Sequence, residues 1–286
     1  MAVDLEKLLA LRIEKLHPYS AKDVMLYALG LGLGREPSNP RQLSFVYEKD
    51  LKVLPTFGSV LGYAGFFPKE RPELGINWKK LLNGEMGIEM HAPIPTSGAV
   101  TGTTVIDRLI DKGAEKGSLL YIRRDVNDEA GNLLCTVTNT TVLRGDGGFG
   151  GPLGRAEPPP SVPQREPDLT FEWPTLPQAA LIYRLSGDYN PLHAEPDVAQ
   201  SAGFAKPILH GAATWGMAGY ALMESLCGGQ PEGFKRMNAR FTSPAFPGEM
   251  QRTLIWKTGR GTAAFRVVAP ERGATVLDNG EFGYLD

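Results

Sequence analysis

The stretch QAALIYRLSGD, residues 178–188, has a counterpart in the first half of the chain. There DVMLYALGLG, residues 23–32, shares the pattern Tyr-x-Leu, so that Tyr27 matches Tyr183. Three matches in the same order at similar spacing predict that the chain contains a duplicated unit. The other two matches are VLPTFGSVLGYAGFF (53–67) with ILHGAATWGMAGYAL (208–222), and MHAPIPTSG (90–98) with FTSPAFPGE (241–249).

Each copy shows the residue patterns of helices followed by strands. Ser20, with Asp23 three residues later, marks the N-cap of a helix over 21–31. After an irregular stretch, a second helix is expected in each copy, within the matched stretches 53–67 and 208–222. A long helix against a curved antiparallel sheet, occurring twice, is an α+β arrangement. Runs rich in β-branched residues predict the strands, which are 100–113, 118–128 and 132–145 in the first copy and 240–246, 250–259, 261–270 and 274–286 in the second.

A proline-rich segment divides the chain almost in half. The sequence GPLGRAEPPPSVPQREPDLTFEWPT, residues 151–175, is poor in aliphatic residues and predicts an extended linker rather than a packed element. We therefore expect an N-terminal unit over 1–150, a linker over 151–175 and a C-terminal unit over 176–286.

The composition limits the partners and the compartment. A net charge of -2 over 286 residues gives no electrostatic footprint for nucleic acid or for an anionic membrane. Cys135 and Cys227 lie far apart without CxxC spacing, which indicates reduced thiols rather than a disulfide framework or a metal site. The sequence shows neither a signal-peptide pattern nor an apolar run that approaches a membrane span. We expect a cytoplasmic protein that binds neither nucleic acid nor membrane.

The stretch SGDYNPLHAEP, residues 186–196, places an acid and an imidazole five residues apart. In an uninterrupted helix, Asp188 and His193 would point about 140° apart. Pro191 excludes that helix and pushes Asn190 toward an extended or turn conformation. The segment is therefore expected to be a loop that can fold both side chains toward one point.

A third element joins this pair further along the chain. His210-Gly211 opens the predicted helix GAATWGMAGYALMESL. The first N–H groups of a helix have no acceptor within the helix and carry its positive end, so the Gly211 N–H can donate to a developing oxyanion. Glycine also lets a substrate carbonyl approach closely. Together, an acid, an imidazole and a backbone donor predict an acid/base site with charge stabilisation.

Each of these residues also has a structural interpretation. Asp188 is a common turn residue, His193 could be a hydrogen-bonded histidine in the interior, and Gly211 could simply begin a helix. The first copy favours a functional role, because Gly32 lies near the position of Asp188 there and Pro55-Thr56 replace His210-Gly211. A structural motif should be needed in both copies, whereas a catalytic one is needed once.

The run YRLSGDYNPLHAEPDVAQSAGFAKPILHG, Tyr183–Gly211, resembles the hydratase signature of the MaoC-like enzymes, also called (R)-specific enoyl-CoA hydratases or hydratase 2. The resemblance extends over nearly the whole chain to the two-unit hydratase found alone in bacteria and as a module of peroxisomal multifunctional enzyme type 2. It implies a double hot dog fold. It also implies a hydro-lyase that reversibly hydrates trans-2-enoyl-CoA to (3R)-3-hydroxyacyl-CoA with no cofactor and no metal. Other segments that carry it are DVMLYALGLG, VLPTFGSV, LLNGEMGIEMHAPIP, GGFGG and ARFTSPAFPGE.

The resemblance also implies roles for individual residues. Asp188 and His193 would hold and activate water, with Asn190 helping to orient them, and the Gly211 N–H would stabilise the thioester enolate. The catalytic unit would be the C-terminal one, and the other would accommodate long or bulky acyl chains. Contacts to the acyl-CoA thioester are implied for Asn83, Gly84, Lys112, His210 and Phe241, with Lys112 as a phosphate contact.

The sequence departs from the family pattern at one point. It leaves open the exact function, the acyl chain length and the oligomeric state. Relatives similar to the animal enzyme have His-Gly where this chain has Asn83-Gly84. The alternatives are a dehydratase that acts on carrier-bound, branched or steroid-type acyl substrates, and a hot dog protein that binds acyl-CoA without hydrating it or acts as a thioesterase. The acyl chain length is not indicated. A homodimer is expected from the habit of the family alone.

Overall fold

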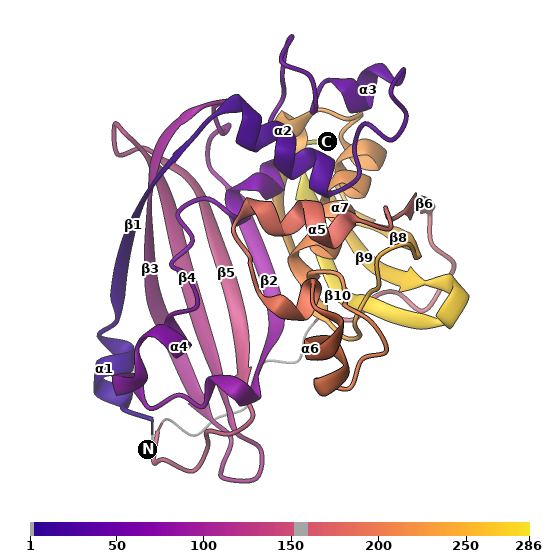
Figure 1. Cartoon of the computed structure of the whole chain (residues 1–286). Coiled ribbons are helices and arrows are strands. Elements are labelled where there is room, and N and C mark those ends of the chain that lie inside the picture. Colours follow the sequence, from indigo (N-terminus) through magenta and orange to yellow (C-terminus); the bar gives the residue numbers. More distant parts are fainter. Residues whose placement is uncertain (1–2, 152–159) are drawn as a thin grey trace.

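A single antiparallel sheet of ten strands runs through both halves of the protein (Figure 1). The computed structural model describes residues 3–151 and 160–286. The strand order is β1-β3-β4-β5-β2-β7-β10-β9-β8-β6. The strands are β1 (Arg12–Tyr19), β2 (Leu81–Met90), β3 (Gly98–Asp111), β4 (Ser118–Asp128), β5 (Leu133–Leu143), β6 (Leu169–Pro174), β7 (Phe234–Phe241), β8 (Met250–Gly259), β9 (Thr262–Ala269) and β10 (Ala274–Tyr284).

The strand order reads the same from both ends, as the duplication predicts. In each half, the first strand lies at the outer edge, a three-strand meander follows, and the strand that precedes the meander lies at the centre. The two central strands, β2 and β7, pair with each other from Glu85↔Arg240 to Glu89↔Arg236. The two sheets are therefore fused edge to edge into one (Figure 1).

The helix expected near residue 21 forms where the sequence places it. Helix α2 (Ala21–Gly30) begins after Ser20, whose backbone N–H donates to Asp23 Oδ2 at 2.8 Å. In the second copy the matching helix α5 (Ala179–Tyr183) is shorter and continues as the 3₁₀ helix η4 (Arg184–Ser186). The two copies pack together, and a Cβ added to Gly30 would lie 3.1 Å from Tyr183 Cα.

The second helix forms in only one copy, which corrects the expectation for the first. Helix α7 spans Gly211–Leu226, whereas residues 53–67 form only the 3₁₀ helix η1 (Pro55–Ser59) before an irregular segment. Gly62 explains the difference, because its φ of +58° is left-handed and a Cβ there would lie 2.5 Å from Gly102 Cα. The chain must leave helical geometry at that point to pass against β3.

The proline-rich linker is also not unpacked throughout, which corrects a second expectation. Its last part, Leu169–Pro174, forms strand β6 and pairs with β8. Trp173 is buried and donates its indole N–H to the carbonyl oxygen of Leu31 at 2.8 Å. The high proline content of the segment masks this short strand at its end. Residues 152–159 of the predicted linker lie outside the described residues.

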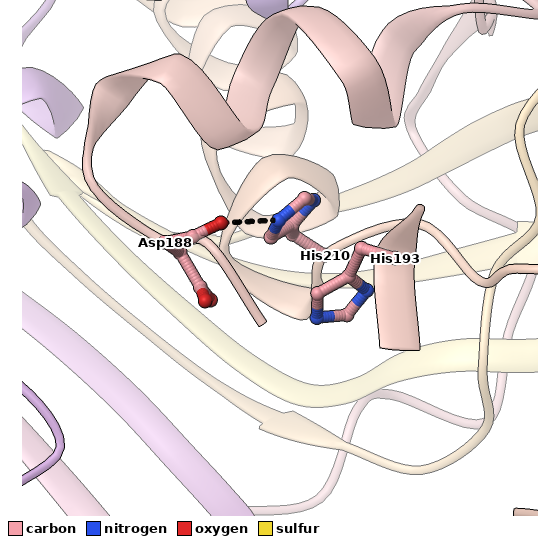
Figure 2. Close-up of side chains that lie close together, drawn as sticks. All are labelled: Asp188, His193 and His210. Carbon is pink, nitrogen blue, oxygen red and sulfur yellow. Dashed lines mark hydrogen bonds between the residues drawn. The ribbon is translucent and has the colours of Figure 1, made fainter. Parts of the chain in front are cut away.

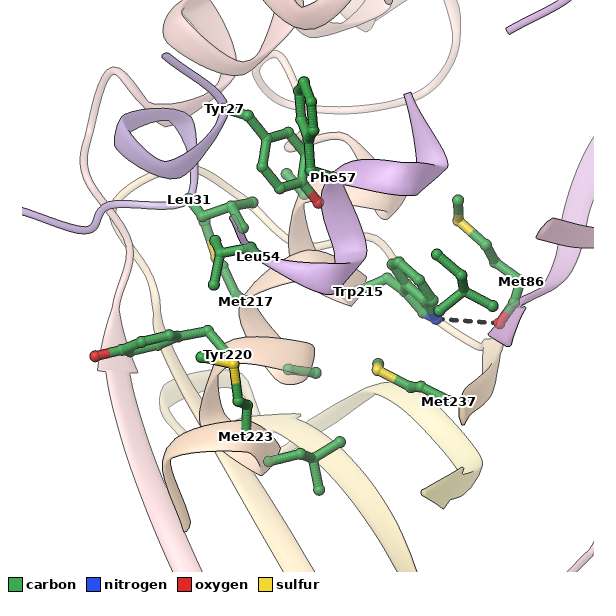
Figure 3. Packing of buried hydrophobic residues seen from close by; sticks show 14 of the residues in the cluster. Tyr27, Leu31, Leu54, Phe57, Met86, Trp215, Met217, Tyr220, Met223 and Met237 are labelled. Carbon is green, nitrogen blue, oxygen red and sulfur yellow. Dashed lines mark hydrogen bonds between the residues drawn. The ribbon is translucent and has the colours of Figure 1, made fainter. Parts of the chain in front are cut away.

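The main hydrophobic core surrounds α7 and continues into both copies (Figure 3). Trp215 of α7 is completely buried and donates its indole N–H to the carbonyl oxygen of Met86 on β2 at 3.0 Å. A Cβ added to Gly219 would lie 2.4 Å from Thr56 Cγ2, so α7 also packs closely against η1. Through these contacts the long helix of the second copy helps to fill the core of the first.

The remaining helices are short, and all but α1, which precedes β1, lie in the connections between strands. Among the described residues, no helix is long and apolar enough to cross a membrane. Cys135 and Cys227 are both free thiols, as the sequence predicts. The short helices are α1 (Leu5–Leu9), α3 (Pro40–Leu43), α4 (Phe67–Glu70), η2 (Pro72–Leu74), η3 (Trp78–Lys80), η5 (Pro191–His193), α6 (Pro196–Ser201), η6 (Pro231–Gly233) and η7 (Pro270–Arg272).

Candidate active site

Three titratable side chains of the second copy come together beside the start of α7 (Figure 2). Asp188 lies on the loop after η4, His193 ends η5, and His210 is the N-cap residue of α7. One carboxylate oxygen of Asp188 and one ring nitrogen of each histidine lie within 4.8 Å of one another. Asp188 is exposed, whereas both histidines are buried. The loop therefore brings Asp188 and His193 together, as the sequence predicts.

His193 is held in one orientation by a backbone carbonyl. Its Nδ1 lies 2.9 Å from the carbonyl oxygen of Ile208, so the proton is assigned to Nδ1 and Nε2 is left with its lone pair. Burial lowers the pKa of His193, against the opposing effects of the Ile208 hydrogen bond and the Asp188 charge. At neutral pH the side chain is thus a neutral imidazole, oriented as a base.

His210 completes the cluster in a way that the sequence does not indicate. Its Nε2 lies 3.1 Å from the backbone carbonyl oxygen of Asp188, the contact that Figure 2 marks with a dashed line. Its ring stacks on that of His193 with 3.7 Å between centroids and 27° between planes. Burial, and then the neighbouring His193, lower the pKa of His210 to about 4, although the Asp188 charge opposes this. His210 therefore stays neutral and fixes the position of the Asp188 backbone.

The loop between Asp188 and His193 is organised by its own side chains. The Asn190 N–H donates to Asp188 Oδ1 at 3.1 Å, and Asn190 Oδ1 accepts from the Leu192 N–H at 3.1 Å. Pro191 then begins the single turn of η5 that ends at His193. Asn190 thus orients the loop, and it does so through local hydrogen bonds to both sides of Pro191.

Gly211 begins α7 and its backbone is exposed. A Cβ added to Gly211 would lie 3.0 Å from Phe241 Cε1, so these two predicted site residues are neighbours. The pairing of β2 with β7 brings two more predicted site residues, Asn83 and Gly84, to this end of the sheet junction. Glu85 pairs with Arg240 at the end of the β2–β7 ladder, so Asn83-Gly84 directly precede that pair on β2 and Phe241 directly follows it on β7. The structure therefore gathers Gly211, Phe241 and Asn83-Gly84 at one end of the β2–β7 junction.

Lys112 lies elsewhere on the molecule. Asp111 pairs with Ser118, Ser118 with Leu143, and Leu143 with Leu81, so the end of β3 lies three strands away from the start of β2. At about 4.8 Å between strands, this separation is about 14 Å. The structure does not bring Lys112 into the cluster of Asp188 and the two histidines. Its position allows a contact only with a part of the ligand that lies far from this cluster.

The arrangement of the histidines bears on whether the cluster could hold a metal ion. Metal ligands direct lone pairs at one point, and the lone pairs of an imidazole lie in its ring plane. The rings of His193 and His210 are stacked nearly parallel, and one nitrogen of each already contacts a backbone carbonyl. This geometry favours an acid/base pair over a metal centre.

Tyr63 and Tyr183 also lie near the cluster, and sequence reasoning gave neither a role. The Tyr183 ring centroid is 5.1 Å from that of His210, and the Asp188 charge adds to the burial that raises the pKa of Tyr183 well above its ordinary value. Burial raises the pKa of Tyr63 to about 12, and the Asp188 charge acts in the same direction. The match of Tyr183 with Tyr27 between the two copies was a sequence signal for Tyr183. Tyr63 comes from the other copy and carried no such signal.

A cleft of about 310 Å³ opens at the other end of the β2–β7 junction. Its lining includes Met90, His91, Pro55 and Lys235, and it contains none of the predicted site residues. Because the cleft lacks the pairing of an acid with an oriented base, the Asp188 cluster is the better candidate for chemistry.

Comparison with known proteins supports one family. The MaoC like domain matches residues 159–279, and the MFE-2 hydratase 2 N-terminal domain matches residues 17–145. A Mycobacterium tuberculosis protein named 3-hydroxyacyl-thioester dehydratase Y is 41% identical over 295 residues, which cover 100% of this chain and 99% of that protein. The chain belongs to the MaoC-like family.

Two further relatives of this MaoC-like chain match along its length. A Mycobacterium tuberculosis enoyl-CoA hydratase is 38% identical, with 98% of each chain covered. The crystal structure of a MaoC-like dehydratase from Phytophthora capsici has a TM-score of 0.87 at 35% identity and covers 99% of this chain and 100% of its own. The fold is the expected double hot dog: a Mycobacterium tuberculosis structure described by that fold has a TM-score of 0.61 at 13% identity, covering 96% and 95% of the two chains.

The depressed histidine pKa values predict how the stability of this MaoC-like protein depends on pH. Folding lowers the pKa of both buried imidazoles, so below their ordinary pKa of about 6.5 the unfolded chain binds more protons than the folded chain. The contribution of the two histidines to the free energy of unfolding is therefore complete above that pH. It is lost as the pH falls toward the pKa in the folded protein, which is about 4 for His210.

Denaturant titrations of the wild type and of His210→Asn at neutral and mildly acidic pH measure this effect. The free energy of unfolding should fall with pH more steeply in the wild type than in the variant. His91→Asn, at an exposed position, is the matched control and should follow the wild type. An equal pH dependence of the free energy of unfolding in the wild type and in His210→Asn would contradict the lowered pKa of His210.

Proposed function

We propose that the protein catalyses the reversible syn hydration of trans-2-enoyl-CoA to (3R)-3-hydroxyacyl-CoA. The observation that carries the proposal is the exposed Asp188 carboxylate within 4.8 Å of an oriented, neutral imidazole. The Gly211 N–H at the start of α7 lies on the same site. The names of two full-length relatives, an enoyl-CoA hydratase and a 3-hydroxyacyl-thioester dehydratase, support the same chemistry.

A water molecule fits between the acid and the base. A hydrogen bond to oxygen or nitrogen spans about 2.8 Å, so two acceptors up to 4.8 Å apart can share one water. His193 Nε2 accepts one hydrogen and the Asp188 carboxylate accepts the other, which leaves a lone pair of the water oxygen for C3 of the substrate. The oxygen bonds to C3, the C2–C3 π electrons move to C2, and one water proton passes through the pair to C2 on the same face.

The charge that accumulates on the thioester oxygen is stabilised by α7. The Gly211 N–H belongs to the first turn of a 16-residue helix, so it has no acceptor within the helix and carries its positive end. Removing one such donor typically costs 10²–10³-fold in kcat. Phe241 lies against Gly211, and with Asn83 and Gly84 it is proposed to line the thioester end of the ligand. Lys112 is proposed to contact a CoA phosphate.

The two units are proposed to divide the work. The C-terminal unit, 176–286, supplies the acid, the base and the oxyanion donor. The N-terminal unit, 1–150, receives the acyl chain. The short η1 and the irregular segment after it support this division, because they cover the N-terminal sheet where the second copy has its long helix.

The same residues would also catalyse dehydration of a 3-hydroxyacyl thioester, since both directions share one transition state. The relative named 3-hydroxyacyl-thioester dehydratase Y favours this as the second candidate. An acyl-CoA binding protein would bind the thioester without turnover, and a thioesterase would release free CoA. A hydratase leaves the thioester intact, so the product distinguishes these alternatives.

Substitution of the acid or the base tests the proposed function directly. Asp188→Asn and His193→Gln should each lower kcat for hydration of crotonyl-CoA by about 10²–10⁴-fold, because each removes one acid/base group. The decay of the enoyl thioester absorbance measures the rate. Asp197→Asn, at an exposed position on α6, is the matched control and should keep the wild-type rate. Near-full kcat in both site variants would refute the assignment.

We also propose a cytoplasmic homodimer. The two free thiols are consistent with a reducing compartment, and β1 and β6 end the sheet at its two outer edges. Light scattering of the purified chain should give twice the mass of one chain. A mass of one chain at concentrations well above those of the assay would overturn the dimer.

A further inference from the structure

The inner face of the N-terminal sheet holds a buried cation that the proposed reaction does not use. Arg124 on β4 is 5% exposed, and its Nη2 donates to the carbonyl oxygen of Ser59. Its Nε makes no hydrogen bond to any of the described residues. A guanidinium carries five N–H donors, so one carbonyl satisfies little of it. Thr104, opposite Arg124 on β3, has a buried hydroxyl that likewise lacks a partner in this part of the chain.

Ser59 and three further residues carry four more buried hydroxyls. They belong to Tyr27, Thr56, Ser59 and Tyr183, and none has a hydrogen-bond partner within residues 3–151 and 160–286. Thr56 and Ser59 are near enough to Tyr27 to oppose the burial that raises its pKa to about 12, yet no hydrogen bond of normal geometry forms. Native proteins leave few buried polar groups unpaired. We call these four residues, with Arg124 and Thr104, the polar lining.

The polar lining reaches the active site by two routes. On one side, the Tyr183 ring lies 5.8 Å from that of Tyr27 and 5.1 Å from that of His210, between centroids. On the other, the Arg124 guanidinium lies 5.6 Å from the centroid of Tyr63, whose pKa is raised to about 12 by burial and, to a smaller extent, by the Asp188 charge. Tyr63 is 44% exposed, so burial affects it less than Tyr183. Both routes connect Asp188 with the interior of the N-terminal unit.

We propose that Arg124 is a specificity residue that recognises a carboxylate at the far end of the acyl chain. This rests on the proposed function, because it requires that the acyl chain enters the N-terminal unit. A carboxylate matches the planar fork of a guanidinium and can accept two of its N–H groups at once. The hydroxyls of the lining can donate to the same oxygens. A methyl end would leave these groups desolvated and unpaired, which disfavours it.

The wild-type protein provides the first test. We would measure kcat/KM for series of trans-2-enoyl-CoA esters of increasing length, each made with a methyl, a hydroxyl and a carboxylate end. At the length that reaches Arg124, the carboxylate end should be preferred over the methyl end by about 10–100-fold, the range expected for a buried charged hydrogen bond. The hydroxyl end should fall between them.

Variants then assign the preference to Arg124. Arg124→Met should bring the carboxylate-to-methyl ratio close to one, and Arg124→Lys, which keeps the charge but loses the fork, should give an intermediate ratio. Arg123→Met is the matched control. Arg123 directly precedes Arg124 on β4 but pairs with Asp107 and Asp125 on the other face, so its removal should leave the ratio unchanged. Thermal unfolding confirms that each variant is folded.

The outcomes separate the inference from the proposed function. Hydration of the methyl-ended esters with no carboxylate preference at any length would overturn the inference and leave the hydratase intact. Equal slowing of all three series by Arg124→Met would show a merely structural role and would also overturn it. Failure to hydrate any ester would overturn the proposed function, and the inference with it. If Arg124→Met does not fold, the wild-type ratio and Arg124→Lys still decide.

Discussion

The pairing of β2 with β7 is the constraint on which the rest of the structure depends. It joins two five-stranded sheets along five residue pairs, from Glu85↔Arg240 to Glu89↔Arg236, and removes two edges that would otherwise expose unpaired backbone groups. An ion pair between Glu85 and Arg240 at 3.3 Å and the indole hydrogen bond from Trp215 to Met86 lie on the same junction. The junction also ends at Arg240, and the next residue, Phe241, lies against Gly211 at the start of α7.

Duplication followed by divergence accounts for the structural differences between the two copies. The second copy keeps a long helix, whose first N–H groups and N-cap histidine make one wall of the site. In the first copy, Pro55 and Thr56 stand at the matching positions, and the chain leaves helical geometry at Gly62. Thr56, which matches Gly211, carries a side chain and is buried, whereas Gly211 is exposed. The inner face of the first copy holds the polar lining.

Much of the fold could be predicted because its signals are local. The Ser20 cap and the alternating strands were predicted from neighbouring residues, and so was the start of α7 at Gly211. The loss of the helix near residue 55 could not be predicted, because it depends on the close approach of Gly62 to Gly102, which are distant in sequence. The strand at Leu169–Pro174 was missed because the prolines before it dominate the composition.

The same distinction applies to the site. Asp188 and His193 share one short loop, so their convergence was predictable from Pro191 alone. The role of His210 depends on stacking against His193, and the effect of the Asp188 charge on Tyr63 depends on how the two copies pack. Arg124 did carry a signal that went unused. It is separated from Leu120 and Val126 on β4 by an even number of residues, so all three side chains share one face of the strand. Because Leu120 and Val126 are buried, this period places Arg124 on the inner face.

The stereochemistry of hydration tests the central claim most directly. Crotonyl-CoA would be hydrated by the wild-type protein in deuterated water, and the configuration at C3 and the position of deuterium at C2 determined. The proposed reaction predicts a (3R) product, and a site that holds water and proton donor on one face of the substrate predicts deuterium added syn to the new hydroxyl. A (3S) product, a random distribution of deuterium, or release of free CoA would contradict the account.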